Sequence, residues 1–162
     1  ADYTGLDKDD ITIAASIDLG RLLLAGYSDG IWIKADGVDR DWLNMLSLNI
    51  LQATRQRISK TEFISCPGCG RTLYDLQSTL REIKSATSHL KGLKIGVMGC
   101  IVNGPGEMAD ADYGYVGAGV GKISLYKGKE CIVKNIPADE AIVRLVELIK
   151  ENGDWIDPVG SL

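Results

Sequence analysis

The sequence predicts a mixed α/β (α+β) fold, in which helices flank a mixed sheet. Segments with helical periodicity alternate with short apolar segments through the first hundred residues. From residue 113 the pattern changes to short strands separated by glycine turns, and one further amphipathic helix follows. A length of 162 residues allows one domain or one and a half, with ample material for a buried core.

The first part of the chain is predicted to form a helix, a short strand and a second helix. Apolar residues within segment 11–25 fall on one helical stripe, namely Ile13, Ile17 and Leu24. Gly26 ends this helix, and residues 30–34 are the strand candidate. Asp39 or Asp41 is expected to cap the second helix. These three elements close no core by themselves, so we interpret them as the trailing edge of a larger α/β domain.

A boundary is predicted near residue 59, and the strands beyond it lead into loops that carry cysteine. Residues 61–65 form a strand that runs into Cys66, and residues 93–98 form another that ends beside Cys100. Open α/β sheets commonly build their sites at the ends of strands. Both cysteine loops therefore stand where a functional site is expected.

Turn and capping residues predict the remaining elements. Strands are expected at residues 113–116, 122–126 and 130–136, the last two as a hairpin. Thr72 and Asp75 resemble a capping pair for a helix between the two cysteine loops. Pro137 begins a final helix, which Asn152 and Gly153 end.

Composition and charge argue against several classes of protein. The net charge is −4 and the lysines and arginines are scattered, so a nucleic-acid binder is not expected. The apolar stretches are too short to span a bilayer. Four cysteines are too few for a disulfide scaffold of this size, which predicts reduced thiols in a cytosol-like compartment. The start Ala-Asp-Tyr-Thr has no initiator methionine and no signal region, which favours a piece of a larger chain over a processed one.

Three cysteines and one glutamate are the candidate site residues. Cys66 and Cys69 are separated by two residues, so both thiolates can bind one metal centre, which Cys100 can close from a distant loop. Glu107 follows Cys100 by seven positions across an Asn-Gly-Pro-Gly turn, which can aim both side chains at one point. The set predicts an iron–sulfur site with three sulfur ligands and one weak oxygen ligand.

Plainer interpretations of these residues stay open. The Cys66–Cys69 spacing alone suits a redox dithiol about as well as a cluster, and half of a zinc site is a further option. The second loop favours the cluster, because small residues let a bulky cofactor approach the backbone. His89, the only histidine, is given no role, and Cys131 is expected to face the core. Arg71 either balances negative charge on a cluster or forms a surface salt bridge.

Glu107 is the candidate catalytic residue. A carboxylate oxygen binds iron less softly than a thiolate does. The iron at that corner could then release its protein ligand and take up a substrate oxygen, acting as a Lewis acid and as the entry point for electrons.

Three segments, in this order, resemble those of one family. They are Ser65-Cys66-Pro67-Gly68-Cys69-Gly70-Arg71-Thr72, Met98-Gly99-Cys100-Ile101-Val102-Asn103-Gly104-Pro105-Gly106-Glu107 and Asp110-Ala111-Asp112-Tyr113-Gly114-Tyr115-Val116-Gly117. The family is 4-hydroxy-3-methylbut-2-enyl diphosphate synthase, of the methylerythritol phosphate route to isoprenoids. The resemblance is strongest from about residue 61 to residue 158, and residues 108–117 look closest to the three-domain form of plants and some bacteria.

The resemblance implies a 4Fe–4S cluster held by Cys66, Cys69, Cys100 and Glu107, in a domain similar to those of sulfite and nitrite reductases. The implied reaction is a two-electron reductive ring opening and dehydroxylation of 2-C-methyl-D-erythritol 2,4-cyclodiphosphate to 4-hydroxy-3-methylbut-2-enyl diphosphate. Ferredoxin or flavodoxin is the implied electron donor. The enzyme would be cytoplasmic in a bacterium or stromal in a plastid, and the full-length form a homodimer.

The resemblance also implies what the chain lacks. The family binds its substrate on an N-terminal TIM barrel, for which 162 residues are too few. Residues 1–59 are then the trailing elements of a preceding TIM-barrel-like domain, and residues 60–162 are the cluster domain. We expect the fragment to show little or no turnover alone. We expect the electron donor on a lysine-bearing rim formed from Lys91, Lys94, Lys122 or Lys127.

Two rival functions remain at this point. The first is a stand-alone iron–sulfur electron carrier, although such a carrier normally shields its cluster with four thiolates. The second is a zinc- or dithiol-stabilised interaction module, which elemental analysis of anaerobically purified protein would decide.

Overall fold

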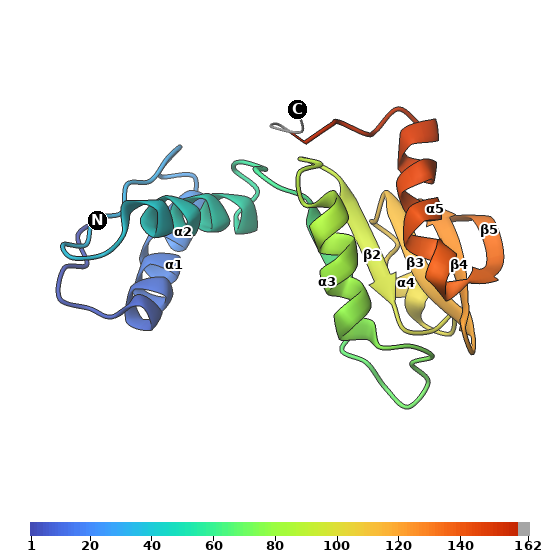
Figure 1. Cartoon of the computed structure of the whole chain (residues 1–162). Helices are drawn as coiled ribbons and strands as arrows, with labels where there is room; N and C mark the ends of the chain where they lie inside the picture. The colour runs from blue at the N-terminus through green and yellow to red at the C-terminus, as the bar shows by residue number, and fades with distance from the viewer. Residues whose placement is uncertain (159–162) are drawn as a thin grey trace. The chain divides into compact units, whose positions relative to one another are not determined.

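The computed structural model describes residues 1–158 and separates into two compact units (Figure 1). The first unit is Ala1–Ser59, and the second begins at Lys60. Each unit has a hydrophobic core of its own. That the first unit is part of a larger barrel-like domain stays a prediction. Among residues 1–158, no helix has the length and apolar character needed to cross a membrane.

The first unit consists mainly of two packed helices. Helix α1 (Lys8–Leu24) begins after Asp7, and α2 (Arg40–Ala53) begins after Asp39, whose carboxylate accepts two backbone hydrogen bonds. Of the two predicted caps, Asp39 is the one used. Buried side chains at helical spacing hold the pair together: Ile11, Ala15, Leu19 and Leu23 of α1 with Leu43, Leu46 and Ile50 of α2.

The predicted apolar stripe of the first helix is wrong. Ile13, Ile17 and Leu24 are 61%, 64% and 73% exposed, whereas Ile11 and Ala15 are fully buried. Helix α1 carries apolar residues around most of its circumference, so helical periodicity alone does not decide which face α2 covers.

The strand expected at residues 30–34 forms only a single bridge. Lys34 pairs with Asp2 in a parallel bridge, supported by the hydrogen bond from Tyr3 N to Lys34 O at 2.8 Å. A strand needs several paired residues on a neighbouring segment, and the backbone bonds of this segment within residues 1–158 go to the first three residues. The first unit is therefore helix, bridge and helix in place of the expected helix–strand–helix.

The second unit is built on one mixed sheet of five strands in the order β1-β2-β3-β4-β5, which confirms the predicted fold class. The strands are β1 (Glu62–Ser65), β2 (Lys94–Met98), β3 (Tyr113–Gly119), β4 (Lys122–Lys127) and β5 (Glu130–Pro137). The first three are parallel, and β4 and β5 are antiparallel additions. The predicted hairpin of the last two strands is confirmed, and β3 runs three residues beyond its predicted end.

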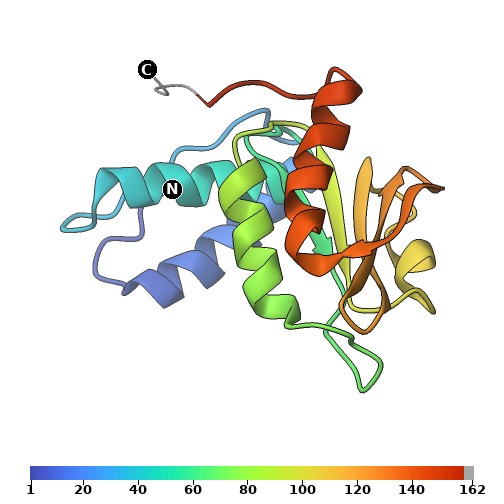
Figure 2. The same ribbon diagram turned by 45° about the vertical axis from the view of Figure 1, so that its right-hand side comes forward.

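Helices α3 (Leu76–Thr87) and α5 (Ala138–Glu151) cover one face of this sheet (Figures 1 and 2). Alternate strand residues point into this layer, where they form the main core with side chains of both helices: Ile95, Val97, Tyr113, Tyr115, Ile123 and Leu125 from the strands, Ile83, Leu145 and Ile149 from the helices. The predicted boundaries of α5, Pro137 and Asn152, are confirmed.

The opposite face of the sheet carries the short helix α4 (Gly104–Glu107) and the loop after it (Figure 2). Met108 follows α4 directly and is buried against the sheet. A Cβ atom on Gly96 or Gly114 would come within 2.7 or 2.5 Å of the Met108 side chain. The absence of side chains at these two strand positions therefore lets α4 lie directly on the sheet, and this places Glu107.

The predicted capping pair before α3 is only half right. Asp75 caps the helix, because its carboxylate accepts a hydrogen bond from Ser78 N at 3.1 Å. Thr72 lies outside the helix, and its hydroxyl accepts a hydrogen bond from Cys69 N at 3.0 Å instead. The threonine belongs to the first cysteine loop.

Candidate metal centre

The two cysteine loops meet at one edge of the sheet. Strands β1 and β2 are parallel, so their carboxyl ends lie side by side. Cys66 follows the last residue of β1, and Cys100 follows β2 by two residues. Helix α4 then begins at Gly104 and carries Glu107 at its end. The predicted Asn-Gly-Pro-Gly turn is thus the start of a single helical turn.

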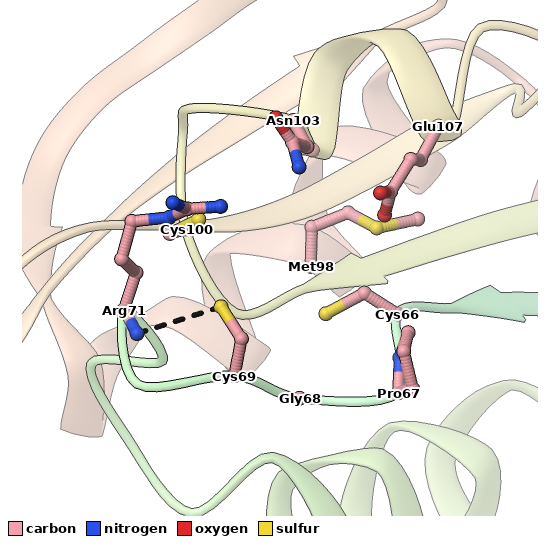
Figure 3. Close-up of a pocket in the computed structure, with 10 residues that line it drawn as sticks. Cys66, Pro67, Gly68, Cys69, Arg71, Met98, Cys100, Asn103 and Glu107 are labelled. Carbon is pink, nitrogen blue, oxygen red and sulfur yellow. Dashed lines mark hydrogen bonds between the residues drawn. The ribbon is translucent and has the colours of Figure 1, made fainter.

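All four predicted site residues line one cavity of about 130 Å³ (Figure 3). The lining residues are Cys66, Pro67, Gly68, Cys69, Arg71, Met98, Cys100, Asn103, Gly104 and Glu107. The sulfur atoms of Cys66 and Cys69 face the same space, and the carboxylate of Glu107 is turned toward it from α4. The described residues contain no disulfide at this site, since all three thiols are free. The structure therefore brings the four candidate side chains together.

Hydrogen bonds between the loops fix their relative position. Gly99 N donates to the sulfur of Cys66 at 3.3 Å, and Gly99 O accepts from Leu73 N at 3.2 Å. The hydroxyl of Tyr74 donates to Met98 O at 2.9 Å. Burial raises the pKa of Tyr74, so its phenol keeps the proton that makes this bond. The first cysteine loop is thereby tied to the strand end that leads into the second.

The first cysteine loop is also closed upon itself. Thr72 N donates to Cys69 O at 2.9 Å, and the Thr72 hydroxyl accepts from Cys69 N at 3.0 Å. Arg71 N donates to the sulfur of Cys69 at 3.4 Å. Backbone N–H groups aimed at cysteine sulfur are typical of sites that stabilise thiolates and tune clusters.

Cys100 has the electrostatic surroundings of a thiolate. The nearby backbone N–H of Val102 has the largest effect and lowers the pKa of the thiol below its ordinary value. The N–H of Asn103 and the guanidinium of Arg71 also lower the pKa of this thiol, whereas burial opposes them. Because the thiolate is the form that binds metal, this environment favours a ligand role for Cys100.

The donors around the cavity can be compared with the ligand geometry of a single metal ion and with that of a cluster. Among residues 1–158, no group of three or more His, Cys, Asp or Glu side chains is placed to hold one ion. Zinc draws all its ligands to within about 2.0–2.3 Å of one centre. A four-iron cluster takes its protein ligands on separate irons, so its ligands stand around a cavity. Three thiols and one carboxylate around a shared cavity fit the second case.

Several other residues considered in the sequence analysis lie away from the cavity. His89 packs edge-on against Trp155, with ring centroids 5.0 Å apart. Cys131 lies on β5 and packs against a small buried cluster that includes Met108 and Tyr126. Lys94 begins β2 and Lys127 pairs with the first residue of β3, so both stand at the edge of the sheet opposite the cysteine loops. Lys91 lies three residues before the start of β2, at the same edge as Lys94.

The predicted lysine rim therefore does not surround the cavity. Lys122, at the start of β4, is the one of the four at the cysteine edge. Sequence reasoning also missed Met98 and Asn103 as lining residues. Their places in the sequence could have indicated this role. Met98 directly precedes Gly99 and Cys100, and Asn103 lies between Cys100 and Glu107.

Comparison with known proteins decides the family. The family described as GcpE protein C-terminal domain matches residues 62–151. The chain belongs to this family. It is 63% identical over 156 residues to 4-hydroxy-3-methylbut-2-en-1-yl diphosphate synthase (flavodoxin) of Parabacteroides distasonis, covering 96% of this chain and 26% of that protein. The predicted resemblance to the C-terminal domain of that synthase is confirmed.

Two further relatives carry the same name. The Bacteroides fragilis protein is 62% identical over 161 residues, covering 99% of this chain and 26% of that protein. The Chlorobaculum tepidum protein is 56% identical over 159 residues, covering 97% of this chain and 21% of that protein. The chain thus spans about a quarter of the length of the curated relatives that it matches.

Proposed function

We propose that this chain is the C-terminal, cluster-binding part of a 4-hydroxy-3-methylbut-2-en-1-yl diphosphate synthase. One observation carries the proposal: Cys66, Cys69, Cys100 and Glu107 come from separate positions in the second unit and line a single cavity. Family membership supports the same reading, because the matched segment contains all four residues. In the longer protein the reaction is the two-electron reductive opening of a cyclic diphosphate.

The three thiols and the Glu107 carboxylate are the residues that would hold a 4Fe–4S cluster. When bound, the cluster supplies electrons and a Lewis-acidic iron at the corner with the oxygen ligand. The chain's own contribution is to hold the three sulfurs by backbone N–H groups and to offer one weaker donor. Glu107 is exposed at the end of α4, so its carboxylate can leave the cavity without unfolding the sheet.

Substrate binding would lie mainly in the remainder of the longer protein. Arg71 is the only cationic side chain among the described residues that line the cavity, whereas a diphosphate needs several. Residues 1–59 would be the trailing elements of the preceding barrel-like domain. The exposed apolar side chains of Ile13, Ile17 and Leu24 support this, because further elements of that domain would cover them. The chain alone would show little or no turnover.

The name of the relatives supports a flavodoxin as the electron donor, and ferredoxin is the alternative donor protein. The complete enzyme would work in the bacterial cytoplasm, and a homodimer is the expected assembly. A stand-alone electron carrier is disfavoured, since the fourth cysteine, Cys131, does not line the cavity and a carboxylate stands there instead.

Anaerobic reconstitution of the chain tests this function. We expect about four iron atoms and four sulfide ions per chain, with the absorption and electron paramagnetic resonance of a cubane cluster after reduction. Zinc bound in preference to iron under the same conditions, or no metal at all, would contradict the proposal. Binding of small exogenous ligands to the reduced protein would separate a substrate-binding cluster from that of an electron carrier.

Replacing Glu107 with alanine is expected to loosen one iron and leave the other three. The carboxylate is the only oxygen donor among the four predicted ligands, so the iron content should fall from about four to about three per chain. Asp110→Ala is the matched control, because Asp110 is an exposed acid three residues further on that does not line the cavity. Equal iron content in both variants would remove Glu107 from the ligand set.

A further inference from the structure

Arg71 touches two of the three candidate sulfur ligands. Its backbone N–H donates to the sulfur of Cys69 at 3.4 Å. Its side chain reaches the other loop, where the guanidinium lies beside the sulfur of Cys100 (Figure 3). One residue thus links the sulfurs of two loops that are about thirty positions apart in the chain.

No carboxylate competes for this guanidinium among residues 1–158. The ion pairs of the described residues do not include Arg71. Glu107, the acid that lines the same cavity, stands on the other side of it (Figure 3). An exposed arginine usually pairs with a carboxylate or extends into solvent. Here the side chain instead turns inward to a thiol, so the salt-bridge interpretation of Arg71 does not hold.

An arginine in this position has a defined electrostatic effect on an iron–sulfur site. Its charge is permanent at any working pH. Uptake of one electron from a flavodoxin-type donor oxidises the donor by one electron and adds one negative charge to the irons and their ligands. A fixed positive charge at a ligand sulfur stabilises the state with the extra negative charge. The reduction potential of an iron–sulfur cluster depends on the net charge around it and on hydrogen bonds to its sulfurs.

We propose that Arg71 is a positioning residue that holds the Cys100 sulfur and raises the reduction potential of the cluster bound at this site. This inference rests on the proposed function, because it requires a cluster at the cavity. It assigns Arg71 to electron acceptance and does not require that the side chain touch substrate.

A redox titration of the anaerobically reconstituted chain, followed by electron paramagnetic resonance, tests the proposal without substrate. Arg71→Met removes the charge and the donor. We expect the equilibrium constant for one-electron reduction to fall about tenfold, which is about 59 mV toward more negative potential. Arg71→Lys keeps the charge and should retain most of the parent potential. Arg81→Met is the matched control, because Arg81 is an exposed arginine on α3 that does not line the cavity, and it should leave the potential unchanged.

Each outcome has one meaning. A parent potential in Arg71→Met, or the same shift in Arg81→Met, would overturn the role of Arg71. If Arg71→Met assembles no cluster, Arg71→Gln replaces it, because glutamine keeps a neutral hydrogen-bond donor in the loop while removing the charge. A parent potential in that variant would likewise overturn the proposal. Failure of the parent chain to take up a cluster would count against the proposed function instead.

Discussion

Replacing Cys100 with serine is expected to abolish cluster assembly in the anaerobically reconstituted chain. Cys66 and Cys69 come from one loop, and Cys100 is the one cysteine among the described residues that the second loop brings to the cavity. A serine hydroxyl keeps its proton at neutral pH and is a harder donor than the thiolate that iron–sulfur clusters need. Iron and sulfide per chain, measured after removal of unbound metal, should both fall close to zero.

Cys131→Ser provides the matched control for this experiment. Cys131 is a free thiol on β5 and does not line the cavity. The same chemical change at that position should leave the iron and sulfide content at the parent level. A normal cluster in Cys100→Ser, or an equal loss in both variants, would contradict the predicted ligand set.

Replacing Gly117 with alanine is expected to destabilise the second unit by about 1–3 kcal/mol, the usual cost of overpacking. A Cβ atom at this position of β3 would lie 2.3 Å from Gly99 O, and both groups belong to the backbone. Gly99 O accepts the hydrogen bond from Leu73 N that ties the first cysteine loop to the second. The backbone must therefore move at the place where both loops are held.

Urea unfolding of the chain measures this effect, with Gly119→Ala as the control. Gly119 lies two residues further along the same strand, and its Cβ would meet only the Lys122 side chain at 3.7 Å, an ordinary contact. We expect the unfolding midpoint to drop for Gly117→Ala and to stay within error for Gly119→Ala. Equal midpoints for the two variants would mean that the sheet adjusts at Gly117 without cost.

The elements of the second unit could be predicted from the sequence because their signals are local. Strands β1 and β2 are short apolar runs that end in glycine and cysteine loops, and the β4–β5 hairpin turns at a glycine. The two loops share an edge because the strands that precede them are parallel neighbours. The candidate ligands Cys66, Cys69, Cys100 and Glu107 could be named from their spacing in these loops, and the structure places all four around one cavity.

Predictions from local sequence patterns were wrong where the pattern allowed two roles for the same residue. Thr72 carries the pattern of a helix cap, yet Asp75 takes that role and the Thr72 hydroxyl closes the cysteine loop. Ile13 and Ile17 have the same helical spacing as the buried Ile11 and Ala15. In both cases the choice depends on which segment packs alongside, and the sequence pattern does not contain that choice.

By itself the sequence determined which candidate sulfur and oxygen donors this protein offers, and which strand ends present them. Only the tertiary structure decided which neighbours act on those donors. It turned Arg71 inward to Cys100 and placed three of the four candidate lysines at the far edge of the sheet. Residue types and their spacing can be taken directly from the sequence. Contacts between distant loops depend on strand pairing and register, and packing across the whole unit sets both.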